Sequence, residues 1–197
     1  MVALIGDSIR MNAQPFVRER LPSGVSLQAP DVNCESSRTV RAHLDAWLPP
    51  GTFDVLHINC GLHDIRHDPG HSRPVCLPHE YADNLRAIFD ALTRGGATIV
   101  WATSTPIDEV RHNAAKASRR YRADLLEYNR ISVEIANACG IRVHDLHAKL
   151  LRTSIDDLPI NDLPINDLLL PDGVHFTPAG NARIGAHIAD AILSAVR

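Results

Sequence analysis

The chain has 197 residues, enough for one domain of ordinary size with a full hydrophobic core. Apolar residues make up 45% and charged residues 22% of it, values that are usual for a soluble globular protein. The formal net charge of −3 gives no electrostatic basis for binding nucleic acid or an anionic membrane. We interpret the basic stretch "KASRRYR" at 116–122 as a solvated helix face.

No apolar run is long enough to span a bilayer, and the N-terminus lacks the basic region and cleavage site of a signal peptide. We therefore expect a cytoplasmic protein with neither a membrane nor a nucleic-acid partner. The spacing of the four cysteines matches no zinc pattern, so we expect free thiols. These cysteines are Cys34, Cys60, Cys76 and Cys139.

Short apolar, β-branched runs alternate along the chain with longer amphipathic ones. Strands are expected at 2–5, 25–30, 53–60, 97–104 and 141–146. Helices are expected at 11–21, 36–48, 79–94, 118–138 and 178–196, with a loop at 61–78. The alternation predicts an α/β fold with a five-stranded parallel sheet and helices on both faces. In such folds ligands bind beyond the carboxyl ends of the strands, so we expect the functional residues there.

One segment interrupts this regular order. Within 158–170 the sequence "LPIND" occurs twice in tandem, at 158–162 and 163–167. A period of five matches neither helix nor strand, and two copies are too few for a solenoid. We interpret 158–170 as a loop insertion in a single domain spanning 1–197, either a flap near the site or a duplication without function.

The loops after the strands carry the residues whose side chains are suited to catalysis. The first strand ends in "GDS", which contains Asp7 and Ser8. Both residue types are favoured helix caps, so this motif alone fits a structural role. Near the other end, "PDGVHFTPAG" places Asp172 and His175 on one short turn before the last helix. A serine nucleophile needs a base to accept its proton and an acid to orient that base, and these two residues supply both.

These two motifs, together with "GLHD" at 61–64, resemble the SGNH (GDSL-type) hydrolases. The resemblance runs essentially from end to end of the chain. It implies a three-layer α/β/α sandwich of the flavodoxin-like type, serine esterase activity, and neither a metal nor another cofactor. It also implies that Ser8 is the nucleophile, His175 the general base and Asp172 the orienting partner of His175.

The sequence departs from the family at the oxyanion hole, the set of donors that binds the developing negative charge. The family usually has Gly-x-Asn-Asp, whose asparagine donates its amide, whereas this chain has His63 at that position. The His63 ring or backbone N–H, or the amide of Asn59, can fill the role, and the position in the motif favours His63. The loss of one such donor raises the barrier in other serine hydrolases by roughly 2.7–4 kcal/mol.

A second departure lies in the loop after the second strand. The family usually has a glycine there whose backbone N–H completes the oxyanion hole, but 33–39 contains none. The backbone N–H of Glu35 or Ser37 can replace it, beside the N–H of Ser8. We expect Asn33 to shape this loop by bonding its own backbone. Asp7 and Asp64 are expected to support the loops of the site.

The resemblance predicts a serine-dependent hydrolase of short-chain carboxylic esters, with O-acetylated carbohydrate as one candidate substrate. Three alternatives remain at this point. The same triad in a drier site could transfer the acyl group to an alcohol or amine. "HDIRHDPGH" spaces His63, His67 and His71 at intervals of four beside Asp64 and Asp68, as in some metal-dependent hydrolases. The third alternative is a binding module with a decayed triad. The sequence does not predict the oligomeric state.

Overall fold

The computed structural model describes residues 1–152 and 164–196. Within these ranges a parallel sheet of five strands has the order β2-β1-β3-β4-β5. The strands are β1 (Val2–Ile5), β2 (Leu27–Gln28), β3 (Val55–Ile58), β4 (Thr98–Ala102) and β5 (Arg142–His144). The helices are α1 (Ser8–Arg20), α2 (Ser37–Trp47), α3 (Pro78–Thr93), α4 (Glu109–Ala115), α5 (Arg122–Ala138), α6 (Leu146–Leu151), α7 (Ile165–Leu168) and α8 (Pro178–Val196). This strand order is that of flavodoxin-like folds, which confirms the predicted class.

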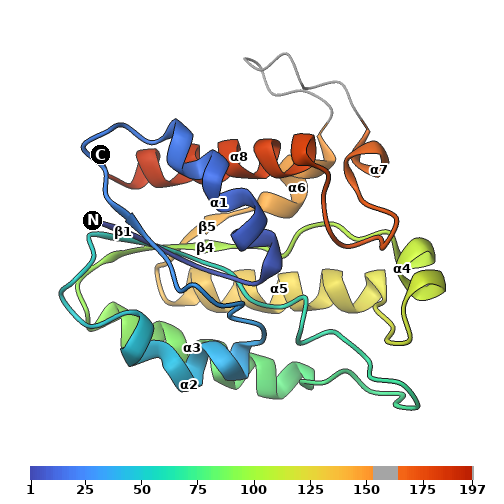
Figure 1. The fold of residues 1–197 in the computed structure, drawn as a ribbon. Coiled ribbons are helices and arrows are strands. Elements are labelled where there is room, and N and C mark those ends of the chain that lie inside the picture. The colour runs from blue at the N-terminus through green and yellow to red at the C-terminus, as the bar shows by residue number, and fades with distance from the viewer. Residues whose placement is uncertain (153–163, 197) are drawn as a thin grey trace.

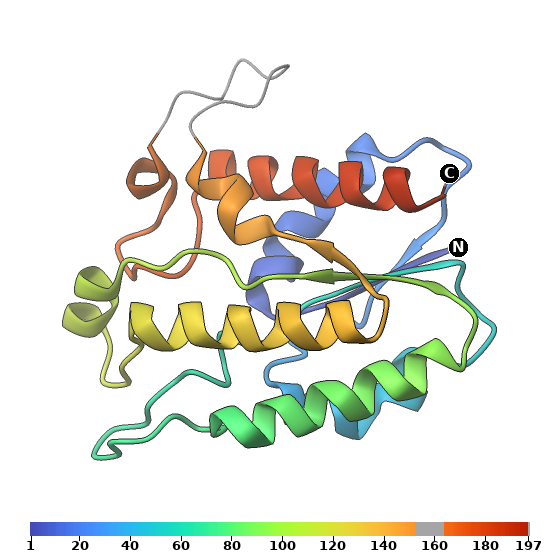
Figure 2. The ribbon, with the colours of Figure 1, turned by 180° about the vertical axis from the view of Figure 1, so that it is seen from behind.

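The helices form a layer on each face of the sheet (Figures 1 and 2). Helices α1, α6 and α8 cover one face, and α2, α3 and α5 cover the other. Every residue of β1 and β3 is buried. Strands covered on both faces need apolar side chains on both, which explains why these runs are continuous and not alternating.

The expected elements differ from the observed ones mainly at their ends. Helix α1 begins at Ser8, three residues earlier than expected, and β2 is only two residues long. Helix α5 begins at Arg122, four residues later than expected. The short helices α4, α6 and α7 were not predicted. Helices of a few residues have no repeating apolar stripe and depend on caps and tertiary packing, so periodicity does not reveal them.

The tandem "LPIND" segment lies partly outside the described residues, which begin again at Pro164. The described part is not a simple loop. Ile165–Leu168 forms α7, Leu168 is fully buried, and Leu169 forms an antiparallel bridge with Phe176. The loop interpretation is therefore wrong for 165–169, because this stretch packs against the segment that leads into α8.

All four cysteines lie in the described ranges and are free thiols. Burial raises the pKa of Cys76 to about 12 and that of Cys60 well above its usual range, so both stay protonated and unreactive. In the described part of the chain, no helix combines the length and the apolar character needed to cross a membrane.

Candidate active site

Ser8 is the first residue of α1 and is separated from β1 by only Gly6 and Asp7. The Asp7 carboxylate caps the helix by accepting the backbone N–H of Ile9 at 2.9 Å. The opening motif therefore has both roles considered from the sequence: Asp7 caps the helix and Ser8 presents its hydroxyl beside the cap. The positive end of the helix dipole at this position favours negative charge on the serine oxygen.

Ser8, His175 and Asp172 form one continuous chain of hydrogen bonds. The Ser8 Oγ lies 2.8 Å from His175 Nε2, and His175 Nδ1 lies 2.6 Å from Asp172 Oδ2. The other Asp172 oxygen, Oδ1, accepts the backbone N–H groups of Val174 at 3.1 Å and His175 at 2.9 Å. The structure thus brings together three residues that the sequence places at opposite ends of the chain.

The pKa of the Asp172 carboxyl is lowered to about 2. Partial burial acts to raise it, but the hydrogen bonds from the His175 ring, the His175 N–H and the Val174 N–H prevail. Asp172 is therefore ionised at neutral pH and holds the proton of the imidazole on Nδ1. Nε2 is left as an acceptor for the Ser8 hydroxyl, which is the arrangement that a general base requires.

Helix α4 supports the turn that carries Asp172 and His175. Gly173 has φ +69°, and a Cβ added there would lie 2.7 Å from the backbone nitrogen of His112 and would also clash with the Asp108 carbonyl. The Gly173 carbonyl accepts the N–H of Asp108 at 2.8 Å. The glycine of "DGVH" is required because only a residue without a side chain fits this close contact with α4.

A buried His112–Arg120 pair extends this support. Arg120 Nη1 donates to His112 Nε2 at 3.0 Å, and His112 Nδ1 lies 3.1 Å from the Asp172 carbonyl oxygen. A guanidinium only donates, so Nε2 is the acceptor and the His112 proton is on Nδ1, directed at Asp172. Burial and the Arg120 charge lower the pKa of His112, in accord with a neutral ring. The interpretation of 116–122 as a solvated helix face is wrong. Residues 116–121 connect α4 to α5 and belong to no helix, and Arg120 is only 8% exposed.

Two of the expected oxyanion donors are occupied by other partners. The Ser37 backbone N–H donates to both Asp64 oxygens, at 3.1 and 2.9 Å, and its hydroxyl donates to Asp64 Oδ1 at 2.5 Å. The Asn59 amide donates to the Ala102 carbonyl at 2.8 Å and so links β3 to β4. The structure does not support either residue as an oxyanion donor. The Ser37 N–H is occupied, the Asn59 amide is held by β4 through one of its two N–H groups, and neither residue lines the pocket beside Ser8.

Asp64 supports the site in the way expected from the sequence. It is fully buried and holds the start of α2 through Ser37. Burial raises the pKa of Asp64 to about 6, although the hydrogen bonds from Ser37 act to lower it. The "GLHD" loop and the loop before α2 are thus fixed to each other by one carboxyl group.

The loop after β2 keeps its shape without the glycine of the family. Glu35 has φ 54°, a left-handed conformation that glycine adopts most easily. The Glu35 N–H donates to Asn33 Oδ1 at 2.9 Å, which confirms that Asn33 shapes this loop and leaves the Glu35 N–H occupied. Because Oδ1 accepts this bond, the Asn33 Nδ2 group keeps both of its protons for the pocket that Asn33 lines with Ser8.

His63 remains a candidate oxyanion donor. It is partly buried and lines the same pocket as Ser8 and His175. Burial lowers the pKa of His63, so the ring is neutral at neutral pH and has one N–H to donate. Within residues 1–152 and 164–196, neither the His63 ring nor the backbone N–H of Ser8 has a hydrogen-bond partner. Both are therefore free to bind an oxyanion.

The histidines of "HDIRHDPGH" do not converge. His67 Nε2 is 2.8 Å from Asp124 Oδ2, and Asp64 is bound to Ser37, whereas His63 faces the pocket. His71 is exposed in the following loop. In the part of the chain that the structure describes, no three metal-ligating side chains come together, so the metal-dependent alternative has no ligand set there.

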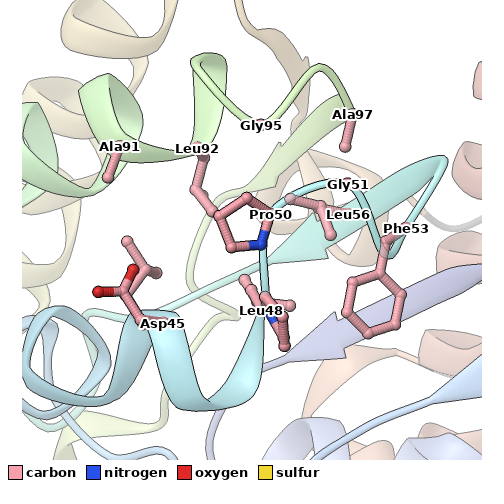
Figure 3. A pocket seen from close by; sticks show the side chains of 12 residues that line it. Asp45, Leu48, Pro50, Gly51, Phe53, Leu56, Ala91, Leu92, Gly95 and Ala97 are labelled. Carbon is pink, nitrogen blue, oxygen red and sulfur yellow. The ribbon is translucent and has the colours of Figure 1, made fainter.

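The pocket beside Ser8 has a volume of about 340 Å³. Its wall contains residues from the two terminal motifs and from 62–66 and 112–120. A second hollow lies at the opposite end of the sheet, between α2 and α3, with Leu48, Pro50, Phe53 and Leu92 around it (Figure 3). Its volume of about 30 Å³ is close to that of one water molecule, so it is too small to hold a substrate.

The sequence analysis missed Asn33 as a donor, His112 and Arg120. Asn33 was noted only for its loop geometry, and His112 and Arg120 belong to no motif. Their positions in the site depend on how 112–120 folds across the carboxyl edge of the sheet. The one available signal was the position of Asn33 in the loop that follows a strand whose carboxyl end faces the site.

Comparison with known families assigns the chain to the GDSL-like lipase/acylhydrolase family, whose model matches residues 4–183. The chain belongs to this family of hydrolases that act on esters. Comparison with curated proteins finds no match.

Solved structures share the fold at low sequence identity. The lipase/acylhydrolase from Enterococcus faecalis is 18% identical with a TM-score of 0.72, over 98% of this chain and 95% of that one. The acetyl xylan esterase AlAXEase is 18% identical with a TM-score of 0.71, over the full length of both chains. A lipolytic protein of the G-D-S-L family from Desulfitobacterium hafniense DCB-2 is 13% identical with a TM-score of 0.69, over 96% and 98% of the two chains.

Proposed function

We propose that the chain hydrolyses carboxylic esters through an acyl-enzyme formed on Ser8. The observation that carries this proposal is the chain of hydrogen bonds from Ser8 Oγ through His175 to Asp172, at 2.8 and 2.6 Å. These three residues line an open pocket, so an ester carbonyl can reach the Ser8 oxygen.

In the first step His175 Nε2 accepts the Ser8 proton as Oγ attacks the ester carbonyl carbon. The imidazolium that forms is stabilised by ionised Asp172. His175 then gives the proton to the leaving alkoxide, and the acyl group stays on Ser8. In the second step His175 takes a proton from water as the water oxygen attacks the acyl carbon. His175 then returns this proton to Ser8 Oγ as the acyl–Oγ bond breaks, which releases the carboxylic acid and free Ser8.

The negative charge on the carbonyl oxygen needs donors in both steps. The candidates are the Ser8 backbone N–H, the His63 ring and the Asn33 Nδ2 group, all of them on the wall of one pocket. A neutral histidine donor in place of the family's asparagine keeps a hydrogen bond to the oxyanion without adding a permanent charge.

We further propose that the enzyme prefers short acyl groups, with O-acetylated carbohydrate as a candidate substrate. A pocket of about 340 Å³ is at the small end of the usual range for ligand sites. One of the solved structures with a similar fold is that of an acetyl xylan esterase.

The test is hydrolysis of p-nitrophenyl esters from acetate to octanoate by the wild type, Ser8→Ala and Ser72→Ala. Ser72 is an exposed loop serine outside the pocket and serves as the matched control. We expect turnover to be highest for acetate and propionate, to persist in Ser72→Ala and to disappear in Ser8→Ala. Hydrolysis that survives in Ser8→Ala would exclude this serine as the nucleophile.

A second readout reports on the nucleophile without a chosen substrate. A fluorophosphonate should phosphonylate the wild type once, and the added mass should map to the peptide that contains Ser8. Ser8→Ala should remain unlabelled. Product analysis with an added alcohol then separates hydrolysis from acyl transfer by the same triad.

A further inference from the structure

Arg120 is a buried cation that lies beside the nucleophile without a carboxylate partner. It is 8% exposed, and in the described ranges no ion pair joins it to an aspartate or glutamate. Burial, followed by the charge of Arg66, lowers the pKa of Arg120 to about 10, although the charges of Asp7 and Asp172 act to raise it. The side chain is therefore still protonated at neutral pH. Buried charges in proteins are normally paired, because an unpaired one loses its hydration without compensation.

Two neutral groups hold the guanidinium in place. Arg120 Nε donates to the Leu62 carbonyl at 2.8 Å, and Nη1 donates to His112 Nε2 at 3.0 Å. These bonds use two of the five N–H donors that an arginine carries. The remaining donors have no partner among the described residues, and Arg120 lines the pocket that contains Ser8 and His175. The arginine is therefore rigidly placed and only partly satisfied.

The pocket wall carries charges of both signs, with cations in the majority. Its two wall carboxylates are hydrogen-bonded to neutral groups, Asp7 to the N–H of Ile9 and Asp172 to the His175 ring, and neither forms an ion pair with Arg120. Of the other two wall cations, Arg66 pairs with Asp68 at 2.8 Å. Lys116 is exposed at the rim and forms no ion pair within the described part of the chain. Three cations thus face two carboxylates on this wall, and in the described ranges Arg120 and Lys116 are the two cations without an ion pair.

We propose that this pocket binds esters that carry an anionic group, a carboxylate or a similar oxyanion, with Arg120 as its ligand and Lys116 assisting at the rim. This inference rests on the proposed esterase function and adds the substrate class. The planar fork of a guanidinium matches the two oxygens of a carboxylate, and its hydrogen bonds to a charged acceptor are stronger than those to a neutral one.

The experiment compares pairs of esters that differ only in the anion. In the first pair, 4-acetoxybenzoate and its methyl ester, the charge is on the alcohol side. In the second pair, mono-p-nitrophenyl succinate and its methyl ester, the charge is on the acyl side, and p-nitrophenol release is measured. Each kcat/KM is divided by the hydroxide-catalysed rate of the same ester, and the anionic-to-neutral ratio is the specificity.

We expect a specificity of about tenfold or more for one of the two pairs in the wild type. Arg120→Lys keeps the charge but loses the planar fork, and should reduce the specificity about tenfold through KM for the anionic ester. Lys116→Met should reduce it about threefold. Arg119→Met is the matched control, because Arg119 is an exposed neighbour that does not line the pocket. It should leave the specificity unchanged.

A specificity of one or less for both pairs in the wild type would overturn the proposal. An equal loss of activity toward both members of a pair in Arg120→Lys would also overturn it, because Arg120 would then be only structural. Binding to Ser8→Ala, measured by calorimetry, decides the matter without turnover: 4-acetoxybenzoate should bind more tightly than its methyl ester. Ser8-dependent hydrolysis without anion preference would leave the proposed function intact and remove only this inference.

Discussion

Two groups of polar residues that contain histidine pack against the same sheet, but they differ in the hydrogen-bond partners of their ring nitrogens. At its carboxyl edge, both ring nitrogens of His175 have partners. Beneath α8, a buried histidine cluster consists of His57 on β3, His144 on β5 and His187 on α8. His57 Nε2 lies 3.0 Å from His144 Nδ1. In the described ranges, the Nε2 atoms of His144 and His187 have no partner.

The difference shows that the partners of a polar group, and not its residue type, decide which charge state the fold supports. Hydrogen bonds keep Asp172 ionised with a pKa of about 2, although burial opposes this. Burial instead lowers the pKa of His57 and of His187 to about 4 and that of His144 to about 2. The triad is arranged to stabilise a charge, whereas the buried histidine cluster is stable only while it is neutral.

The largest expected effect comes from substitution of Asp172, which supplies the charge that the triad stabilises. Asp172→Asn keeps the size of the side chain but lets His175 adopt the wrong tautomer, and we expect kcat to fall by roughly 10⁴. The far-ultraviolet circular dichroism should not change. Asp83→Asn, an exposed substitution on α3, is the control. A loss of less than tenfold would show that Asp172 does not orient the base.

Gly173→Ala tests the support of the triad turn by α4. The new Cβ would be forced into the backbone of α4 at a residue with φ +69°. We expect the free energy of unfolding to fall by about 2–3 kcal/mol and the esterase rate to fall with it. Urea denaturation measures the first quantity. Gly70→Ala provides a control, since Gly70 also has positive φ but open space around it. The smaller loss in free energy of unfolding that we expect for Gly70→Ala gives the contribution of backbone strain alone.

The buried histidine cluster predicts loss of stability in mild acid. Its folded-state pKa values are below the unfolded value of 6.5, so the unfolded chain binds more protons as the pH falls from about 6.5 to 4. We expect each of the three histidines to lower the free energy of unfolding by ~1–2 kcal/mol between pH 7 and pH 5. Asp172 contributes nothing in this window, since its depressed pKa costs stability only below about pH 4.

His187→Leu should flatten this pH dependence, and exposed His79→Leu is its control. Asp64 acts in the opposite direction. Its pKa is raised to about 6, so its folded form holds a proton that the unfolded chain has released, and its contribution weakens as the pH rises from about 4 to 6. Asp64→Asn should therefore make the loss of stability in acid steeper. An unchanged slope in His187→Leu would contradict the role given to the cluster.

The smallest expected effect concerns His112. His112→Gln can still donate to the Asp172 carbonyl but fits Arg120 less well, so we expect kcat to fall by about fivefold to tenfold. KM for neutral esters should stay constant, because the residue acts through the triad turn and not on substrate. A KM that rises while kcat holds would assign His112 to substrate binding instead.

The sequence alone determined the α/β class and the three triad positions. Both are local properties. Continuous apolar runs and strand-end motifs depend on neighbouring residues, and Asp172 and His175 meet within a single turn, so no long-range contact has to be predicted. Ser8 follows because the carboxyl ends of parallel strands share one edge of the sheet.

Only the tertiary structure decided which donors are free. The sequence left Ser37, Asn59 and His63 as candidates, with His63 favoured over Asn59 by its position. In the structure Ser37 is bound to Asp64 and Asn59 to Ala102, and His63 is the one of the three that lines the pocket. The burial of Arg120 was equally hidden within a basic stretch. A hydrogen-bond partner distant in sequence is set by how loops cross at the sheet edge, and residue types or spacing carry no record of that crossing.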